Sequence, residues 1–164
     1  MILRIKFDAE LYIVFETSSA NVYCVDILLE CKWNFNQSNG VFASPYFPDD
    51  YHNFQDCQWN ITAPKGYVIQ LRFGVFELES NPYSCGNGRC SCDYVEVKEE
   101  SVTGDVVTLG RYCMAKLPLP IVQSSANRMI VTFYSDHATS AKGFNASYTS
   151  VPGTIIGIMR SLNA

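Results

Sequence analysis

The sequence has few charged residues, no surplus of positive charge and no long apolar run. Asp, Glu, Lys and Arg make up 17% of its 164 residues, and 12 Lys and Arg stand against 16 Asp and Glu. A nucleic-acid-binding surface takes its affinity from basic side chains on phosphates, so this balance argues against that function. No apolar run approaches the roughly 20 residues of a membrane-spanning helix, so the sequence predicts no membrane span.

Motifs of the common enzyme classes are also missing. The chain has 2 histidines, His52 and His137, and both stand beside turn-forming residues. It contains no G-x-S-x-G, no H-E-x-x-H and no phosphate-cradling glycine loop. Paired carboxylates could serve a glycosidase, but the chain is short for a substrate cleft. We interpret His137 as an exposed loop residue, and the sequence predicts no enzymatic activity.

Apolar residues, aromatic residues and cysteines are abundant. Apolar residues account for 48% of the chain and aromatics for 13%, which excludes intrinsic disorder and predicts one domain with a sizeable core. The count of 7 cysteines is high for a cytosolic protein. Asn36, Asn60 and Asn145 each begin an Asn-x-Ser/Thr glycosylation signal. Together these features predict an extracellular protein, secreted or part of an ectodomain.

From about residue 40 onward the chain has the pattern of short β-strands. In Tyr67–Phe73 apolar side chains alternate with Gln70 and Arg72, and Cys57–Ile61 alternates in the same way. Segments rich in Pro, Gly, Asn and Asp separate these runs. The pattern predicts an all-β fold, an antiparallel two-sheet sandwich or jelly roll. Further strand-like runs are Tyr94–Lys98, Val106–Leu109, Met129–Tyr134 and Phe144–Tyr148.

The first 30 residues fit this pattern poorly. Their apolar stretch Leu11–Phe15 is flanked by Glu10 and Glu16 and is too short for the core of a signal peptide. We expect residues 1–30 to be a leader or a mis-assigned segment of a truncated or mis-started chain. Cys24 lies in this segment.

An ordered series of motifs runs along the chain after residue 30. The motifs are Cys31, Gly40–Pro45, Cys57–Ile61, Pro64–Tyr67, Phe76–Glu79, Cys90–Val97, Gly110–Cys113, Phe133–Asp136 and Gly143–Tyr148. This series resembles the CUB domain, a module of extracellular proteins. The resemblance implies a two-sheet jelly-roll sandwich, in agreement with the strand pattern. It predicts a CUB domain at residues 31–149 and a C-terminal tail at 150–164.

The resemblance also implies a disulfide framework, from which this chain departs. The family pattern pairs its first cysteine with its second and its third with its fourth, which here implies the bonds Cys31–Cys57 and Cys90–Cys113. Cys92 replaces the usual aromatic residue and Cys85 lies in an insertion, and we expect these two thiols to oxidise to a local bond. Cys24 is left over.

A zinc site is the competing interpretation of three of these cysteines. Cys85, Cys90 and Cys92 could supply thiolate ligands to one ion. Their spacing is unlike the paired C-x-x-C spacing of zinc knuckles, which argues against this interpretation.

Three acidic residues match the pattern of the calcium-binding subset of CUB domains. The resemblance implies Glu79, Asp93 and Asp136 as metal ligands, Tyr51 as a support for the loop, and Ca²⁺ as the cofactor. Backbone carbonyls of His137–Ser140 and water would complete the coordination. Three carboxylates in one loop cluster repel one another, and Ca²⁺ relieves that repulsion and suits irregular oxygen ligands better than Mg²⁺ does. The alternative is three solvated surface acids.

By this resemblance the chain is an extracellular, non-catalytic protein-interaction module with calcium-stabilised loops. Its partner would be an extracellular protein whose exposed Lys or Arg pairs with ligands of the ion. The alternatives are an accessory CUB fragment of a larger secreted protease and a glycan-binding domain of the spermadhesin type.

Overall fold

The computed structural model describes residues 2–7, 11–18, 21–22, 31–80, 85 and 90–153. The chain divides into two compact units, Met1–Cys31 and Lys32–Ala164. The first unit holds a three-stranded antiparallel sheet of β1 (Ile2–Phe7), β2 (Leu11–Ser18) and β3 (Asn21–Val22). These strands were not predicted, because residues 1–30 were interpreted as a leader or mis-assigned segment, although Leu3–Phe7 alternates between apolar and charged residues. Cys24 lies outside the described residues.

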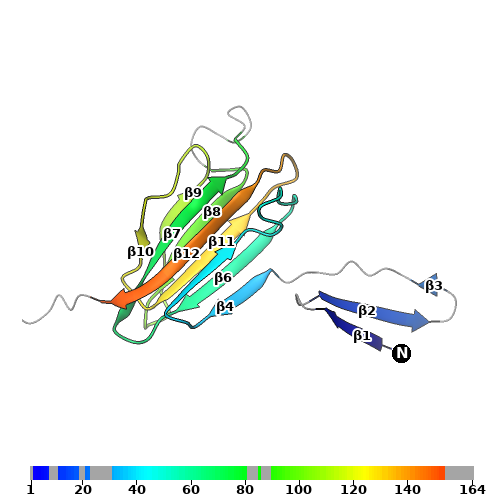
Figure 1. Ribbon diagram of the computed structural model, residues 1–164, viewed down its shortest axis with the longest axis horizontal. Coiled ribbons are helices and arrows are strands. Elements are labelled where there is room, and N and C mark those ends of the chain that lie inside the picture. The colour runs from blue at the N-terminus through cyan, green and yellow to red at the C-terminus, as the bar shows by residue number, and fades with distance from the viewer. Residues whose placement is uncertain are drawn as a thin grey trace, which may run out of the picture. The chain divides into compact units, whose positions relative to one another are not determined.

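The second unit consists of two sheets, which Figure 1 shows as two layers. The four-stranded sheet has the order β10 (Val122–Gln123), β7 (Tyr67–Glu77), β12 (Gly143–Pro152), β5 (Asn39–Ala43). The five-stranded sheet has the order β4 (Lys32–Phe35), β6 (Asp56–Thr62), β11 (Arg128–Tyr134), β8 (Tyr94–Glu100), β9 (Val106–Tyr112). The predicted all-β jelly-roll sandwich is confirmed. No helix in the described part of the chain is long and apolar enough to cross a membrane.

The longer strands lie where alternation predicts them, whereas the short ones were not predicted. The structure adds β4, β5 and β10, which span only a few residues each. Among the described pairings of this unit, β4 with β6 is parallel and the others are antiparallel. β12 continues to Pro152, beyond residue 149. The division of the chain into three segments stays a prediction.

Aromatic side chains from both sheets fill the space between the layers. Phe144 on β12 is fully buried, and its ring lies edge-on to Trp59 of β6 and to Phe133 of β11, at 5.5 and 5.6 Å between centroids. Phe42 of β5 stacks on Trp59 at 5.1 Å. Edge-to-face and offset contacts are the favourable geometries for aromatic pairs. The core therefore joins the two sheets through neutral, well-packed groups.

Two loops meet at the end of the sandwich where β11 ends and β8 begins. Tyr134 of β11 is paired with Tyr94 of β8, so the residue before Tyr94 and the residues after Tyr134 emerge together. Gly143 starts β12 with φ of 85°, and a Cβ there would collide with Ser44. Glycine is the residue that accepts this left-handed conformation without strain. It turns the chain from this end of the molecule back into the four-stranded sheet.

Candidate metal centre

Three carboxylates from distant parts of the sequence converge at this end of the sandwich. Glu79 follows β7, Asp93 precedes β8 and Asp136 follows β11, and one oxygen atom from each lies within 4.8 Å of the others. Glu79 and Asp93 are buried, at 6% and 1% exposed, and Asp136 is partly exposed. The structure thus gathers the three predicted ligands into one cluster that faces the surface through Asp136.

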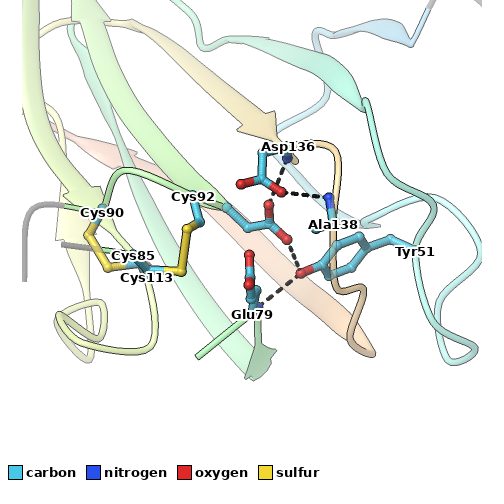
Figure 2. Close-up of a disulfide and its surroundings, with 9 residues drawn as sticks. Tyr51, Glu79, Cys85, Cys90, Cys92, Cys113, Asp136 and Ala138 are labelled. Atoms are coloured by element: carbon cyan, nitrogen blue, oxygen red, sulfur yellow. Dashed lines mark hydrogen bonds between the residues drawn. A yellow bond between two sulfur atoms is a disulfide. The ribbon is translucent and has the colours of Figure 1, made fainter. Parts of the chain in front are cut away.

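Tyr51 ties two of the carboxylate-bearing segments together. Its side chain is fully buried, and its hydroxyl donates a hydrogen bond to Oδ2 of Asp93. The Tyr51 hydroxyl oxygen also accepts the backbone N–H of Glu79 at 3.0 Å, and Figure 2 shows both bonds. The ring packs edge-on against Phe133 at 5.0 Å. Tyr51 therefore links Asp93 to the backbone of Glu79, and its role as the support of a metal site stays a prediction.

Backbone amides hold the two aspartates in place. Asp93 accepts the N–H of Asp136 on Oδ1 at 2.8 Å, and Asp136 accepts the N–H of Ala138 on its own Oδ1 at 2.9 Å. Figure 2 shows this chain of bonds running from one loop into the next. A carboxylate oxygen with one hydrogen bond keeps a second lone pair. Both side chains are thus oriented and still have oxygen lone pairs for a cation.

Ser135 and Asn53 complete the frame, and the sequence reasoning missed both. The Ser135 hydroxyl is buried, donates to the carbonyl of His52 at 2.9 Å and accepts the N–H of Gln55 at 2.8 Å. The Asn53 amide donates to the carbonyl of His137 at 3.0 Å. These are bonds from side chain to backbone across loops far apart in sequence. No local pattern marks Asn53, whereas Ser135 lies within the Phe133–Asp136 motif and could have been singled out from it.

Glu79 carries the least satisfied charge in the cluster. Thr139 hydrogen-bonds its carboxylate, but Oε2 is buried and has no hydrogen-bond partner. Burial raises the pKa of Glu79, and repulsion from Asp136 and Asp93 raises it further. Leaving a buried carboxylate oxygen unpaired is unfavourable unless a cation or donor meets it. The cluster therefore fits a positive ligand.

Burial also raises the pKa values of Asp93 and Tyr51, the two groups beside Glu79. Burial raises the pKa of Asp93, against the opposing effect of the hydrogen bonds from Tyr51 and from the Asp136 N–H. Burial also raises the pKa of the Tyr51 hydroxyl well above its ordinary value, and the bond to Asp93 adds to this. The Tyr51 hydroxyl therefore stays protonated and acts as a donor. Oxygen ligands of irregular loop geometry are the set that Ca²⁺ prefers.

Two disulfides flank the cluster. Cys85 is bonded to Cys92, and Cys90 is bonded to Cys113, as predicted. The zinc interpretation is wrong, because all three of its thiols are consumed in these bonds. Two further cysteines, at 31 and 57, are also disulfide-bonded, and their pairing with each other stays a prediction.

The predicted glycosylation sites differ in their surroundings. Asn36 is exposed. The Asn60 amide group donates to Asn34 at 3.0 Å, and Asn145 accepts the backbone N–H of Val75 at 2.7 Å through Oδ1. Glycosylation of all three stays a prediction, with the most accessible side chain at Asn36.

His137 is exposed, as expected for a loop residue.

A protein-family model for the CUB domain matches residues 31–148. The chain belongs to the CUB domain family. It is 39% identical over 134 residues to mouse membrane frizzled-related protein, covering 82% of this chain and 22% of that protein. It spans between 3% and 25% of the length of the curated relatives considered.

Two solved structures share the fold. One is the full extracellular region of zebrafish Gpr126/Adgrg6, with 34% identity and a TM-score of 0.60 over 75% of this chain and 15% of that chain. The other is the MASP-1 CUB2 domain bound to Ca²⁺, with 24% identity and a TM-score of 0.59 over 71% of this chain and 96% of that chain. CUB domains generally serve as interaction modules in extracellular proteins.

Proposed function

We propose that this CUB domain is an extracellular, non-catalytic module that binds Ca²⁺ through Glu79, Asp93 and Asp136 and uses the ordered loops to bind a protein partner. The observation that carries the proposal is Oε2 of Glu79, which is buried and unpartnered while its carboxylate lies beside two others. A solved CUB domain of the same fold, that of MASP-1, holds Ca²⁺.

The cation would supply positive charge to the carboxylates around Glu79, because the favourable effect of His137 on Glu79 is outweighed by burial and by repulsion from Asp136 and Asp93. Three carboxylates within 4.8 Å repel one another, and burial of Glu79 and Asp93 weakens the screening by water. Bound Ca²⁺ converts this repulsion into attraction and ties together the loops that follow β7 and β11 and precede β8. Tyr51 acts as a positioning group, because its hydroxyl already bridges Asp93 and the Glu79 backbone.

The proposed partner group is an exposed Lys or Arg side chain. The three carboxylates carry three negative charges and the ion two positive charges, so the site keeps an excess of one negative charge. Asp136 is its partly exposed member and is the side chain that a partner can reach. An ion pair at a partly exposed site speeds association and is weakened by salt. Partner binding should therefore fall in EDTA and at high ionic strength.

Calorimetric titration of Ca²⁺ into the full chain tests the metal site. We expect binding to the wild type and a rise in Tm, since ligand at 100 times Kd stabilises the folded state by about 2.7 kcal/mol. Asp136→Ala should abolish both. Asp105→Asn is the matched control, because Asp105 is an exposed acid in the turn between β8 and β9 and should leave both unchanged. A wild type that shows neither heat nor a Tm shift contradicts the proposal.

A second candidate is that the domain is an accessory part of a larger secreted protease. The observation that favours it is the short span of the chain on its relatives, 22% of the mouse protein and 11% of human tolloid-like protein 2. The complete transcript decides between them. A protease domain in the same reading frame would support this candidate, and its absence would leave the interaction module.

A further inference from the structure

The Cys85–Cys92 disulfide lies in the connection between two of the three carboxylates. Cys92 directly precedes Asp93, and Cys85 lies between Glu79 and Cys92 in the connection from β7 to β8. The bond therefore closes a short loop within this connection, and that loop ends directly before Asp93. The bond Cys90–Cys113 instead ties this connection to the residue that follows β9.

The disulfide also lies against the carboxylate of Glu79. The Sγ atoms of Cys85 and Cys92 and a Glu79 carboxylate oxygen all lie within 4.8 Å of one another. Figure 2 shows the sulfur atoms on one side of Glu79 and the Tyr51 hydroxyl on the other. A disulfide sulfur has no proton to donate, so it excludes water from this carboxylate without satisfying it. This explains why Glu79 is only 6% exposed and its Oε2 has no partner.

We propose that the Cys85–Cys92 disulfide is a positioning element that pre-organises Glu79 and Asp93 for the cation and thereby raises the affinity for Ca²⁺. The inference rests on the proposed calcium function. Tyr51 fixes the Glu79 backbone, but its bonds do not fix the Glu79 carboxylate. Without the disulfide, this side chain and the connection after it gain freedom that cation binding must remove, and water reaches the carboxylate.

A double variant, Cys85→Ser with Cys92→Ser, tests this without leaving an unpaired thiol in the loop. The full chain is titrated with Ca²⁺ by calorimetry, and Tm is recorded in Ca²⁺ and in EDTA. We expect Kd for Ca²⁺ to rise about tenfold and the calcium-induced rise in Tm to shrink. Ser91→Ala is the matched control, because Ser91 is exposed and lies between Cys90 and Cys92. It should keep the wild-type Kd.

The outcomes separate this inference from the proposed function. If the double variant loses Tm equally in Ca²⁺ and in EDTA and keeps the wild-type Kd, the disulfide is merely structural and the inference is overturned, while the calcium site stands. If the wild type itself binds no Ca²⁺, the proposed function fails and the inference fails with it.

A second measurement uses the wild type alone, so it does not depend on how the variant folds. Two glutathione thiols reduce the Cys85–Cys92 bond to two cysteine thiols and leave one glutathione disulfide. Because coupling is reciprocal, a bond that strengthens Ca²⁺ binding tenfold must itself be ten times harder to reduce when Ca²⁺ is bound. For this two-electron couple the midpoint in Ca²⁺ should lie about 30 mV below that in EDTA.

Alkylation and peptide mass analysis across glutathione buffers report that midpoint. Asp136→Ala is the control, since it keeps both cysteines but lacks the proposed cation site, and its midpoint should be the same in Ca²⁺ and in EDTA. Equal midpoints for the wild type in the two conditions overturn the inference.

Discussion

The aromatic core and the carboxylate cluster are both buried, but they are stabilised in opposite ways. Phe144, Trp59 and Phe133 are neutral and surrounded by apolar contacts that need nothing from outside the chain. Glu79 and Asp93 are equally inaccessible, yet burial raises the pKa of both because the charged form is disfavoured. The core holds the fold together, whereas burying the carboxylates of the cluster costs stability unless a positive group meets them.

The largest expected effect comes from removing the central ring of the core. Phe144→Ala should lower the free energy of unfolding by about 3–5 kcal/mol, because it leaves a cavity between the sheets. The loss should be the same in Ca²⁺ and in EDTA, as measured by urea denaturation. Phe54→Ala is the control, since Phe54 is 76% exposed and should change stability by less than about 0.5 kcal/mol. A loss of stability that is seen in Ca²⁺ but not in EDTA would contradict the inference that the core is stabilised independently of the carboxylate cluster.

The next largest effect concerns Tyr51, which belongs to both regions. Tyr51→Phe keeps the ring against Phe133 but leaves Asp93 and the Glu79 N–H without the shared hydroxyl. We expect a loss of about 1–3 kcal/mol and weaker Ca²⁺ binding in a calorimetric titration. Tyr134→Phe is the matched control, because Tyr134 is 39% exposed and stacks on Tyr94. Unchanged Ca²⁺ affinity in Tyr51→Phe would show that the hydroxyl does not position the ligands.

The dependence of stability on pH should have opposite signs for buried Glu79 and partly buried Glu96. Because the folded-state pKa of Glu79 is raised, the cation-free protein loses stability as pH rises through that pKa, so Glu79→Gln should raise Tm in EDTA at pH 7. The Glu96 pKa is lowered: burial alone would raise it, but Lys98 and Arg111 outweigh that effect. Its contribution is present above the unfolded-state pKa and is lost as pH falls through the folded-state pKa.

Thermal melts in EDTA across about pH 4 to 8 measure both effects. Glu96→Gln should lower Tm at pH 7 by an amount equivalent to no more than about 1 kcal/mol, since Arg111 and Lys98 are partly exposed, at 42% and 32%. In Ca²⁺, by contrast, Glu79→Gln should have a lower Tm than the wild type, because the substitution removes a proposed ligand. A lower Tm of Glu79→Gln in EDTA would contradict the inference that the charged Glu79 side chain destabilises the cation-free protein.

The smallest effect is expected at the glycosylation sites. Asn36→Gln should remove glycan mass from protein secreted by eukaryotic cells and shift stability by less than about 0.5 kcal/mol, because Asn36 is exposed. Asn145→Gln should instead cost about 0.5–1.5 kcal/mol, since the Val75 N–H loses its acceptor. Intact mass and urea denaturation measure both. Unchanged stability in Asn145→Gln would contradict the role of Asn145 Oδ1 as the acceptor of the Val75 N–H.

The sequence by itself determined the strands that alternate and the residues that pack between them. Cys57, Trp59 and Ile61 are all buried, as their spacing requires, because successive side chains of a strand point to opposite faces. It did not predict β4 or β10, because a strand of two to four residues has too few alternations to be recognised. Nor was the sheet of β1 to β3 predicted, because residues 1–30 were interpreted as a leader or mis-assigned segment despite the alternation in Leu3–Phe7.

The same division holds for the candidate site. The resemblance to calcium-binding CUB domains nominated Glu79, Asp93, Asp136 and Tyr51. The presence of two extra cysteines in one loop of an extracellular domain predicted the bond Cys85–Cys92. Only the tertiary structure decided that Oε2 of Glu79 is buried without a partner, that Tyr51 bridges two segments, and that the disulfide lies against Glu79. The physical reason is that alternation and spacing are local properties of the chain. Burial of a charge depends on which distant segments meet around it, and the packing of the two sheets sets that.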